Sequence, residues 1–305
     1  MATSVTDLDG LVCETVSVPP GPTRRRPSPR ASRIGGIAVR GLAVSLLVFY
    51  GLLSVYPFLW MVSGAFKDVQ EVTSSGSLLP QRPTLQTLID TWSTLDFALF
   101  LRNSVVLTGI SLILIVIVYS LAGYALSVMT FPGRRLVFAG FLAILFVPGV
   151  TTLLPLVLLF YELGLLNSWT GLALAFANGA APLAILIFKS LYDSIPREIH
   201  EAARIDGASE FRIYWRLYLP LARPAIITVL VLNFVSIWNE YVLTAVVLSD
   251  PEKYSLPLGL QNLLSTNVVR WNDVMAGSLL LVVPVIFVFV LLQRYFVSSI
   301  TGAVK

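Results

Sequence analysis

The sequence is poor in the residues from which active sites and metal centres are usually built. It has one cysteine, Cys13, and one histidine, His200, among 305 residues. A disulfide or a thiolate metal site needs more than one thiol, so neither forms within this chain. We expect His200 to be a solvated loop residue. An enzyme embedded in a membrane would need a nucleophile, an acid-base pair or a metal cluster, and this sequence supplies none.

A phosphate-binding loop is also missing. The chain contains no GxxxxGK[ST] pattern, the sequence in which a glycine-rich turn and a helix N-terminus cradle the phosphates of ATP. We therefore expect no cofactor in this chain.

Charged residues are scarce, and long apolar runs take their place. Only 12% of residues are charged and 56% are hydrophobic, whereas soluble domains have about 25% charged residues. About 20 apolar residues suffice to cross a bilayer as a helix, and the alternation typical of membrane strands is absent. The sequence therefore predicts an all-α membrane protein with six transmembrane helices: Gly41 to Val62, Val105 to Met129, Leu136 to Tyr161, Thr170 to Phe188, Ala225 to Leu248 and Val274 to Leu292.

Lysine and arginine are unevenly divided between the two sides of these spans. Sixteen of the 21 basic residues fall in the N-terminal tail, the second and fourth connections and the C-terminus. Cytoplasmic segments carry the excess of Lys and Arg. Both termini and the loop of residues 193–224 are therefore expected in the cytoplasm of a multi-pass plasma-membrane protein, and the loops of residues 67–102 and 249–273 outside.

The first forty residues are rich in Pro, Ser and Arg and predict a disordered, basic cytoplasmic tail. A signal peptide is the alternative. The run from Gly41 to Trp60 is longer than a signal-peptide core, and no small-residue cleavage site follows it. We expect this run to remain as the first span.

The loop of residues 193–224 contains a pattern of two short helices. Ser194 and Pro196 suit the start of a helix, and Gly207 suits the left-handed position that ends one. The small residues Ala202, Ala203 and Ala208 would let a partner's backbone approach closely. After a cap at Ser209, the spacing of Phe211, Trp215 and Tyr218 predicts an amphipathic helix at the lipid headgroups, which Pro220 and Pro224 end.

This loop resembles the EAA loop of ABC importer permeases. Glu201, Ala202 and Ala203 are followed by Gly207 and, after nine residues, by Leu217, Leu219 and Pro220; only Leu217 departs from the family pattern, which has Ile there. The segments YPFLWMVSGAFK, WNEYVLTAVVLSDPEKYSLPLGL and QRYFVSSITGAVK resemble the maltose-type permeases of carbohydrate uptake. The resemblance covers nearly everything after Gly41.

The resemblance implies a type I ABC importer permease architecture, the MetI-like fold, with a cytoplasmic coupling helix. It implies that Glu201 makes a charged contact with an ATPase, that Ala202 and Ala203 pack there and that Gly207 permits the turn. The residues expected to act in coupling are Glu201, Ala202, Ala203, Asp206, Gly207, Leu219 and Pro220.

The same resemblance implies the partners and the cargo. The partners are a second permease subunit in a heterodimer, two copies of a cytoplasmic ABC ATPase, an extracytoplasmic solute-binding protein and the lipid bilayer, with no nucleic acid. ATP and Mg²⁺ would bind to the ATPase subunits. The cargo is a sugar or oligosaccharide, or alternatively a glycerol phosphate or glycerophosphodiester. A secondary transporter is a further alternative, but it would need ionisable residues at the bilayer midplane and often an internal repeat, which the sequence lacks.

Several membrane features stay open on the sequence alone. On one helix, Asn233, Ser236, Glu240 and Thr244 would form a single stripe, which either lines the translocation path or serves helix packing, with Glu240 meeting water or Arg270. Prolines 148, 155 and 182 favour kinks, which are either gating hinges or ordinary features of membrane helices. Most of the tryptophans are expected to be interfacial anchors. The 67–102 loop either docks a binding protein or is a plain connector with short helices.

Overall fold

A computed structural model describes residues 29–264 and 269–302. Within these ranges all regular structure is helical. The longer helices are α1 (Pro29–Ala65), α4 (Phe97–Ser127), α5 (Arg134–Ile144), α6 (Gly149–Glu162), α7 (Trp169–Asp193), α11 (Arg223–Trp238) and α14 (Trp271–Gly302). The shorter ones are α2 (Val69–Ser74), α3 (Gln86–Thr94), α8 (Arg197–Ile205), α9 (Glu210–Ile213), α10 (Leu219–Leu221), α12 (Val242–Val247) and α13 (Leu256–Gln261).

Membrane-spanning length is reached by four of the described helices. These are α1 from Arg40 onward, α4, α7 and α14 up to Leu291. Two bent pairs, α5 with α6 and the segment Glu210–Leu221 with α11, pass the same test only when joined, which allows up to six spans. The expected all-α membrane fold is thus confirmed.

The third expected span is not one helix. Helices α5 and α6 meet at a bend of 103°, and Pro148, in an extended conformation, directly precedes α6. Proline lacks the N–H that would continue the helix and disfavours a helical residue before it. By contrast, α6 and α7 run through Pro155 and Pro182 without ending. A hinge motion at Pro148 stays a prediction.

The helix that contains the first span begins before the span itself. Helix α1 begins at Pro29, so it includes residues that the sequence pattern assigned to the tail. A helix that has already nucleated extends by one hydrogen bond per residue. The remainder of the expected tail, residues 1–28, lies outside the described residues. The chain divides into one compact unit up to Tyr56 and a second unit from Pro57 onward.

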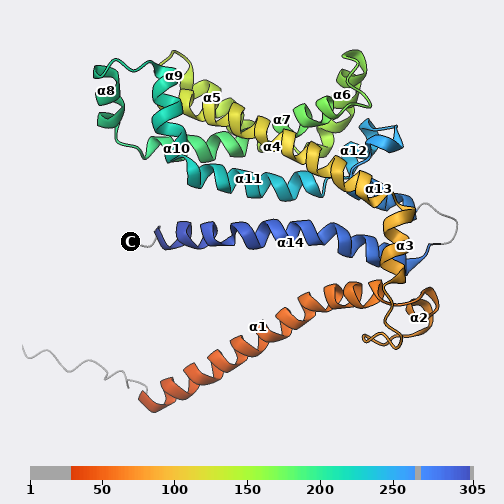
Figure 1. The fold of residues 1–305 in the computed structure, drawn as a ribbon. Coiled ribbons are helices and arrows are strands. Elements are labelled where there is room, and N and C mark those ends of the chain that lie inside the picture. The colour runs from red at the N-terminus through yellow and green to blue at the C-terminus, as the bar shows by residue number, and fades with distance from the viewer. Residues whose placement is uncertain (1–28, 265–268, 303–305) are drawn as a thin grey trace, which may run out of the picture. The chain divides into compact units, whose positions relative to one another are not determined.

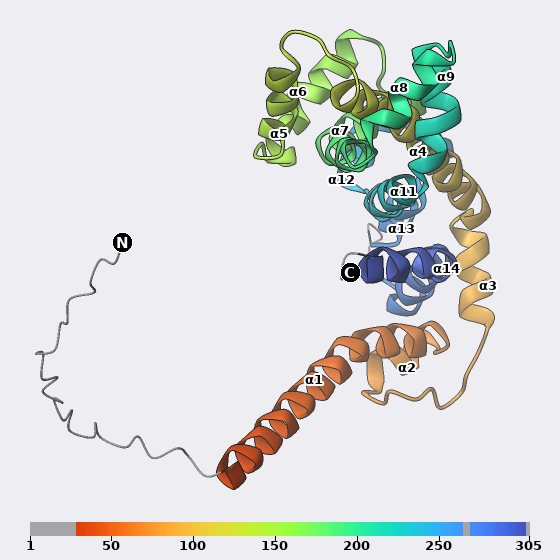
Figure 2. The same ribbon diagram turned by 90° about the vertical axis from the view of Figure 1, so that its left-hand side faces the viewer.

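The core of this unit is formed by α4, α7 and α11, which lie side by side in both views (Figures 1 and 2). Helix α7 contributes the small residues Ala177, Ala181 and Ala184 to it. At Gly123 on α4, a Cβ atom would lie 2.6 Å from the Cβ of Phe188 on α7. Small residues allow such close approach between membrane helices. The two helices therefore form a tightly packed pair.

Short elements occupy the two ends of this core. In Figure 1, α8 and α9 lie beyond the C-terminal end of α7, and α12 and α13 lie toward its N-terminal end. Helix α7 has 25 residues, a length of about 37 Å at 1.5 Å per residue. The loop that contains α8 is thus separated from the 249–264 segment by the length of a membrane span.

The segment from Lys67 to Arg102 contains α2 and α3, as expected, and is fixed by buried polar contacts. Lys67 is only 2% exposed, and its ammonium donates to the Ser77 carbonyl. The hydroxyl of Thr87 donates to the Lys67 carbonyl at 3.1 Å. These contacts hold the segment in a defined structure. Its use as a docking site stays a prediction.

Candidate functional site

The loop between α7 and α11 begins with α8, a nine-residue helix. Ser194 does not start it: its hydroxyl donates to the Leu191 carbonyl at 2.6 Å and so finishes α7, while Pro196 precedes α8 without a side-chain cap. The Ser194 interpretation was therefore wrong, because the hydroxyl reaches back to the α7 carbonyl. The entry into α8 depends on the fixed backbone of Pro196 instead.

The end of α8 agrees with the expectation. Gly207 has a φ of +78°, its N–H bonds to the Arg204 carbonyl at 3.0 Å, and the N–H of Ala208 bonds to the Ala203 carbonyl at 3.1 Å. These two bonds form a Schellman motif, which ends a helix with a left-handed residue. Asp206 is the C-cap residue before it. Gly207 thus determines the sharp turn toward α9.

The two faces of α8 differ sharply. Its outward face is an exposed stripe at positions i, i+3, i+4 and i+7, consisting of Glu198, Glu201, Ala202 and Ile205. Ile205 is 87% exposed. Sequence reasoning missed this apolar residue, although its spacing from Glu198 was readable. We call these four residues the α8 stripe.

The inward face of α8 corrects two expectations. Ala203 and Ala208 pack against the core of their own chain, so of the three alanines expected to admit a partner only Ala202 is exposed. The His200 side chain is only 12% exposed and its Nδ1 is buried without a hydrogen-bond partner in the described residues. His200 is therefore not solvated, because it shares the inward face with Ala203, three residues away.

A carboxylate links α8, α9 and α4. Glu210 Oε2 accepts a hydrogen bond from the Tyr124 hydroxyl at 2.8 Å. Its Oε1 lies 3.6 Å from Nε2 of His200 and 3.7 Å from Nε of Arg204. Beside this carboxylate lies a cavity of about 380 Å³ that Tyr192 also lines. The sequence offers no signal for a pair 86 residues apart, and neither Glu210 nor Tyr124 was singled out.

The predicted amphipathic helix after Ser209 forms only in part. The Ser209 hydroxyl accepts from the Arg212 N–H at 3.4 Å, so its capping role is confirmed. Phe211 and Trp215 are exposed, and their rings stack with centroids 6.2 Å apart. Tyr218, in contrast, is only 2% exposed. A π-helical turn covers Tyr214–Tyr218. Its wider turn carries Tyr218 from the outer face into the core.

The chain bends after this turn, as the prolines led us to expect. Leu219 and Pro220 belong to α10, and Ala222 separates it from α11. The segments on the two sides of the break differ in direction by 71°. Leu219 packs against the core cluster, and Pro220 is exposed. These two residues therefore shape the return into the membrane.

The polar stripe expected on the fifth span is interrupted. Helix α11 ends at Trp238, and the chain resumes helix only at Val242. The side chain of Asn239 donates to the Val235 carbonyl at 2.8 Å, and Glu240 Oε1 accepts from the Leu243 N–H at 2.7 Å. Such local side-chain bonds compete with a continuous helix.

The four residues of that stripe consequently lie in different surroundings. Asn233 bonds to the Val229 carbonyl, Ser236 is exposed, Glu240 caps α12 and Thr244 is 1% exposed. Arg270 pairs with Asp273 at 3.2 Å rather than with Glu240. The geometric argument for a single stripe is lost, and any role of these residues in a path stays a prediction.

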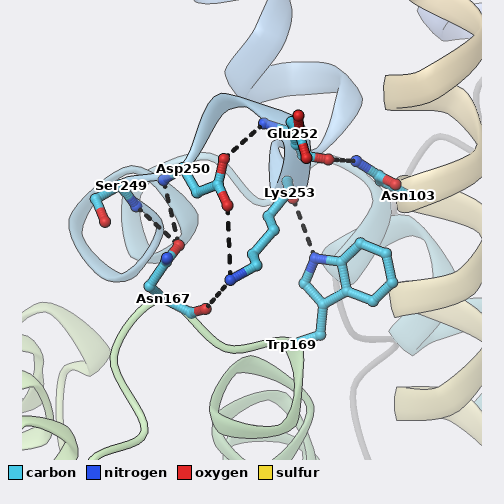
Figure 3. Close-up of polar contacts among 7 residues, drawn as sticks. All are labelled: Asn103, Asn167, Trp169, Ser249, Asp250, Glu252 and Lys253. Carbon is cyan, nitrogen blue, oxygen red and sulfur yellow. Dashed lines mark hydrogen bonds and ion pairs between the residues drawn. The ribbon is translucent and has the colours of Figure 1, made fainter.

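A second polar cluster lies at the opposite end of the core (Figure 3). Asn167, with φ +53°, accepts hydrogen bonds at its side-chain oxygen from the N–H groups of Ser249 and Asp250, at 3.4 and 3.2 Å. Lys253 donates to the Asn167 carbonyl at 3.0 Å and lies 3.7 Å from the Asp250 carboxylate. The segment after α12 is thus attached to the loop that precedes α7.

The same segment is attached to α4 and α7. Asn103 donates to the Glu252 carbonyl at 2.8 Å, and the Trp169 indole N–H donates to the Lys253 carbonyl at 3.1 Å (Figure 3). Trp169 therefore serves the fold as a hydrogen-bond donor. Trp238 is 2% exposed and donates to the Leu281 carbonyl, which corrects its interpretation as an interfacial anchor.

Metal ligands do not gather in the part of the chain that the structure describes: no group of three His, Cys, Asp or Glu side chains there could hold a metal ion.

Comparison with known proteins gives one family. Residues 121–302 match the family described as the binding-protein-dependent transport system inner membrane component. An inner membrane ABC transporter permease protein of Escherichia coli, YcjP, is 34% identical over 90% of this chain and 97% of its own length. The diacetylchitobiose uptake system permease protein NgcG of Streptomyces coelicolor is 30% identical over 84% of this chain and 86% of its own.

A solved structure has the same fold. A chain from a bacterial ABC transporter involved in the import of the acidic polysaccharide alginate superimposes with a TM-score of 0.77 at 27% identity, over 88% of this chain and 98% of that one. The family match, the relatives and the shared fold agree with the resemblance found in the sequence, and this chain belongs to the family of inner membrane components of binding-protein-dependent ABC transport systems.

Proposed function

We propose that this chain is a permease subunit of an ABC importer for a sugar or oligosaccharide, and that the α8 stripe docks on a separate ATPase. The observation that carries the proposal is the stripe itself. Glu201, Ala202 and Ile205 are exposed on one face. Burial of a large apolar side chain such as Ile205 would be favourable. A partner cleft with a basic group would cover the apolar atoms and pair with Glu201.

The other subunits of the transporter are proposed from the family membership. A second, similar permease would complete the path, two ATPase subunits would bind ATP and Mg²⁺ and a solute-binding protein would deliver the cargo from outside. The concentration of Lys and Arg near α8 and both termini supports a cytoplasmic position for them. The relatives' names refer to sugar uptake, and the glycerol phosphate alternative gains no support from them.

The proposal is tested by transport into proteoliposomes that contain this chain, its neighbouring permease, the ATPase and the binding protein. The panel consists of labelled mono-, di- and trisaccharides with glycerol phosphates as the competing class. We expect ATP-dependent uptake of a saccharide. Uptake of a glycerol phosphate alone would contradict the carbohydrate assignment.

The Glu201→Lys variant tests the docking role in the same vesicles. Because the reversed charge would repel a basic partner, we expect uptake to disappear while the protein still inserts into the membrane. The control is Glu198→Lys, at the edge of the same stripe, which should lose less activity. Normal uptake by Glu201→Lys would contradict the proposal.

A further inference from the structure

We propose that Tyr124 and Glu210 act as positioning residues that clamp α8 to the cytoplasmic end of α4, so that movement of the ATPase-facing helix is passed to the spans. This inference rests on the proposed docking of the α8 stripe. It assigns a role to two residues outside that stripe. Neither residue faces outward with the stripe.

The position of α8 needs such a clamp because the helix has little packing of its own. None of its nine residues is fully buried, and among its apolar side chains only Ala203 packs against the core cluster. Pro196 precedes α8, and Gly207 follows it in a left-handed conformation. These two residues set the directions in which the chain enters and leaves the helix. They do not hold the helix against α4.

The Tyr124–Glu210 bond supplies that contact. At 2.8 Å it joins a phenol on α4 to a carboxylate on α9, and a hydrogen bond to an ionised acceptor is stronger than a neutral one. The other oxygen of the carboxylate faces His200 and Arg204 on α8. These pairs are partly exposed, so each contributes less than the Tyr124 bond. The carboxylate of α9 therefore contacts side chains of two other helices, α4 and α8.

The phenol is itself rigidly placed. The Tyr124 ring packs against Tyr192 of α7 at 6.2 Å and against Tyr218 of the π-helical turn at 5.0 Å. Tyr218 in turn lies 6.0 Å from the His200 ring. Tyr124 is 4% exposed. A displacement of α8 thus reaches α4 and α7 through packed rings and one carboxylate.

The test is the number of sugar molecules transported per ATP hydrolysed, in proteoliposomes of the complete transporter. Tyr124→Phe keeps the ring and removes the hydroxyl, and Glu210→Ala removes the acceptor. The matched control is Tyr119→Phe, five residues earlier on α4, whose hydroxyl forms no hydrogen bond with α8 or α9 among the described residues. Glu210→Gln keeps an acceptor for Tyr124 and loses the charge.

We expect Tyr124→Phe and Glu210→Ala each to lower this ratio by about three- to tenfold, and Tyr119→Phe to keep it. Glu210→Gln should recover part of the loss. The Tyr124→Phe/Glu210→Ala double variant should resemble the single variants, because both remove one interaction. If Tyr124→Phe does not reach the membrane, Glu210→Ala, at a partly exposed position, decides the outcome.

Two results would overturn the clamp and are distinguishable. Unchanged ratios in both variants, with uptake still abolished by Glu201→Lys, would remove the clamp and leave the docking role standing. No ATP-dependent sugar uptake by the unaltered chain would remove the proposed function and the clamp with it.

Discussion

At the scale of residues, the direction of each side chain on α8 decides its role. Glu201 and Ile205 point outward, whereas His200 and Ala203 point inward. The helical period predicts which of these residues share a face, but not which face meets the core. That choice is made by Glu210, Tyr124 and Tyr218, which come from other segments. His200 was therefore wrongly expected to be solvated, because the sequence does not show that its face of α8 meets the core.

Gly207 offers a test at this scale. An added Cβ would meet open space, so Gly207→Ala would cost only the left-handed backbone, about 1 kcal/mol. We expect the α8 amides to exchange hydrogen about fivefold faster in this variant. Gly207→Asn should have a smaller effect, because Asn tolerates this conformation. Gly140→Ala, with open space and no positive φ, is the control. Equal exchange in Gly207→Ala and the control would contradict the strain argument.

At the scale of elements, the sequence predicted which helices exist better than it predicted where each helix is interrupted. Apolar length located all the main helices, since burial in lipid requires it. The breaks arise from local features that hydropathy does not report. Pro148 bends the third span, and Asn239 and Glu240 interrupt the fifth. The π-helical turn Tyr214–Tyr218 shifts the register of the amphipathic segment. The missing N–H of Pro148 and the side-chain bonds of Asn239 and Glu240 override an apolar average.

The attachment of the 249–264 segment to α4 offers a test at this scale. The Leu256 N–H donates to the Ser104 hydroxyl at 2.7 Å in a buried position. Ser104→Ala would leave that N–H unsatisfied, so we expect a loss of about 1–3 kcal/mol in the free energy of unfolding. The measurement is thermal unfolding in detergent.

The control for this change is Ser111→Ala on the same helix. Its hydroxyl donates to the Leu107 carbonyl of its own helix. Removal of this hydroxyl therefore leaves no hydrogen-bonding group of another element without a partner. A midpoint of unfolding for Ser104→Ala equal to that of Ser111→Ala would show that the bond does not hold the segment.

At the scale of the whole molecule, two polar regions lie at opposite ends of the α4–α7 pair. The region around α8 is the side proposed to meet the ATPase, and the cluster around Asn167 lies at the other end. The charge distribution predicts that these two ends lie on opposite sides of the membrane, and that assignment stays a prediction. The charge distribution could not predict the contacts that build either end, because these join residues such as Asn103 and Glu252 that are far apart in the chain.

The most direct test of the central claim uses the fact that Cys13 is the sole cysteine. In a Cys13→Ser chain, a single cysteine is placed at Ala202 on the α8 stripe or at Leu79 on the other side, where the side chain is 76% exposed. Labelling with a membrane-impermeant maleimide and cross-linking to the ATPase are then measured in the assembled transporter.

We expect Ala202→Cys to be labelled only from the cytoplasmic side and to cross-link to the ATPase, and Leu79→Cys to be labelled only from outside without a cross-link. Labelling of Ala202→Cys from outside, or the absence of its cross-link in a complex that still transports sugar, would contradict the account.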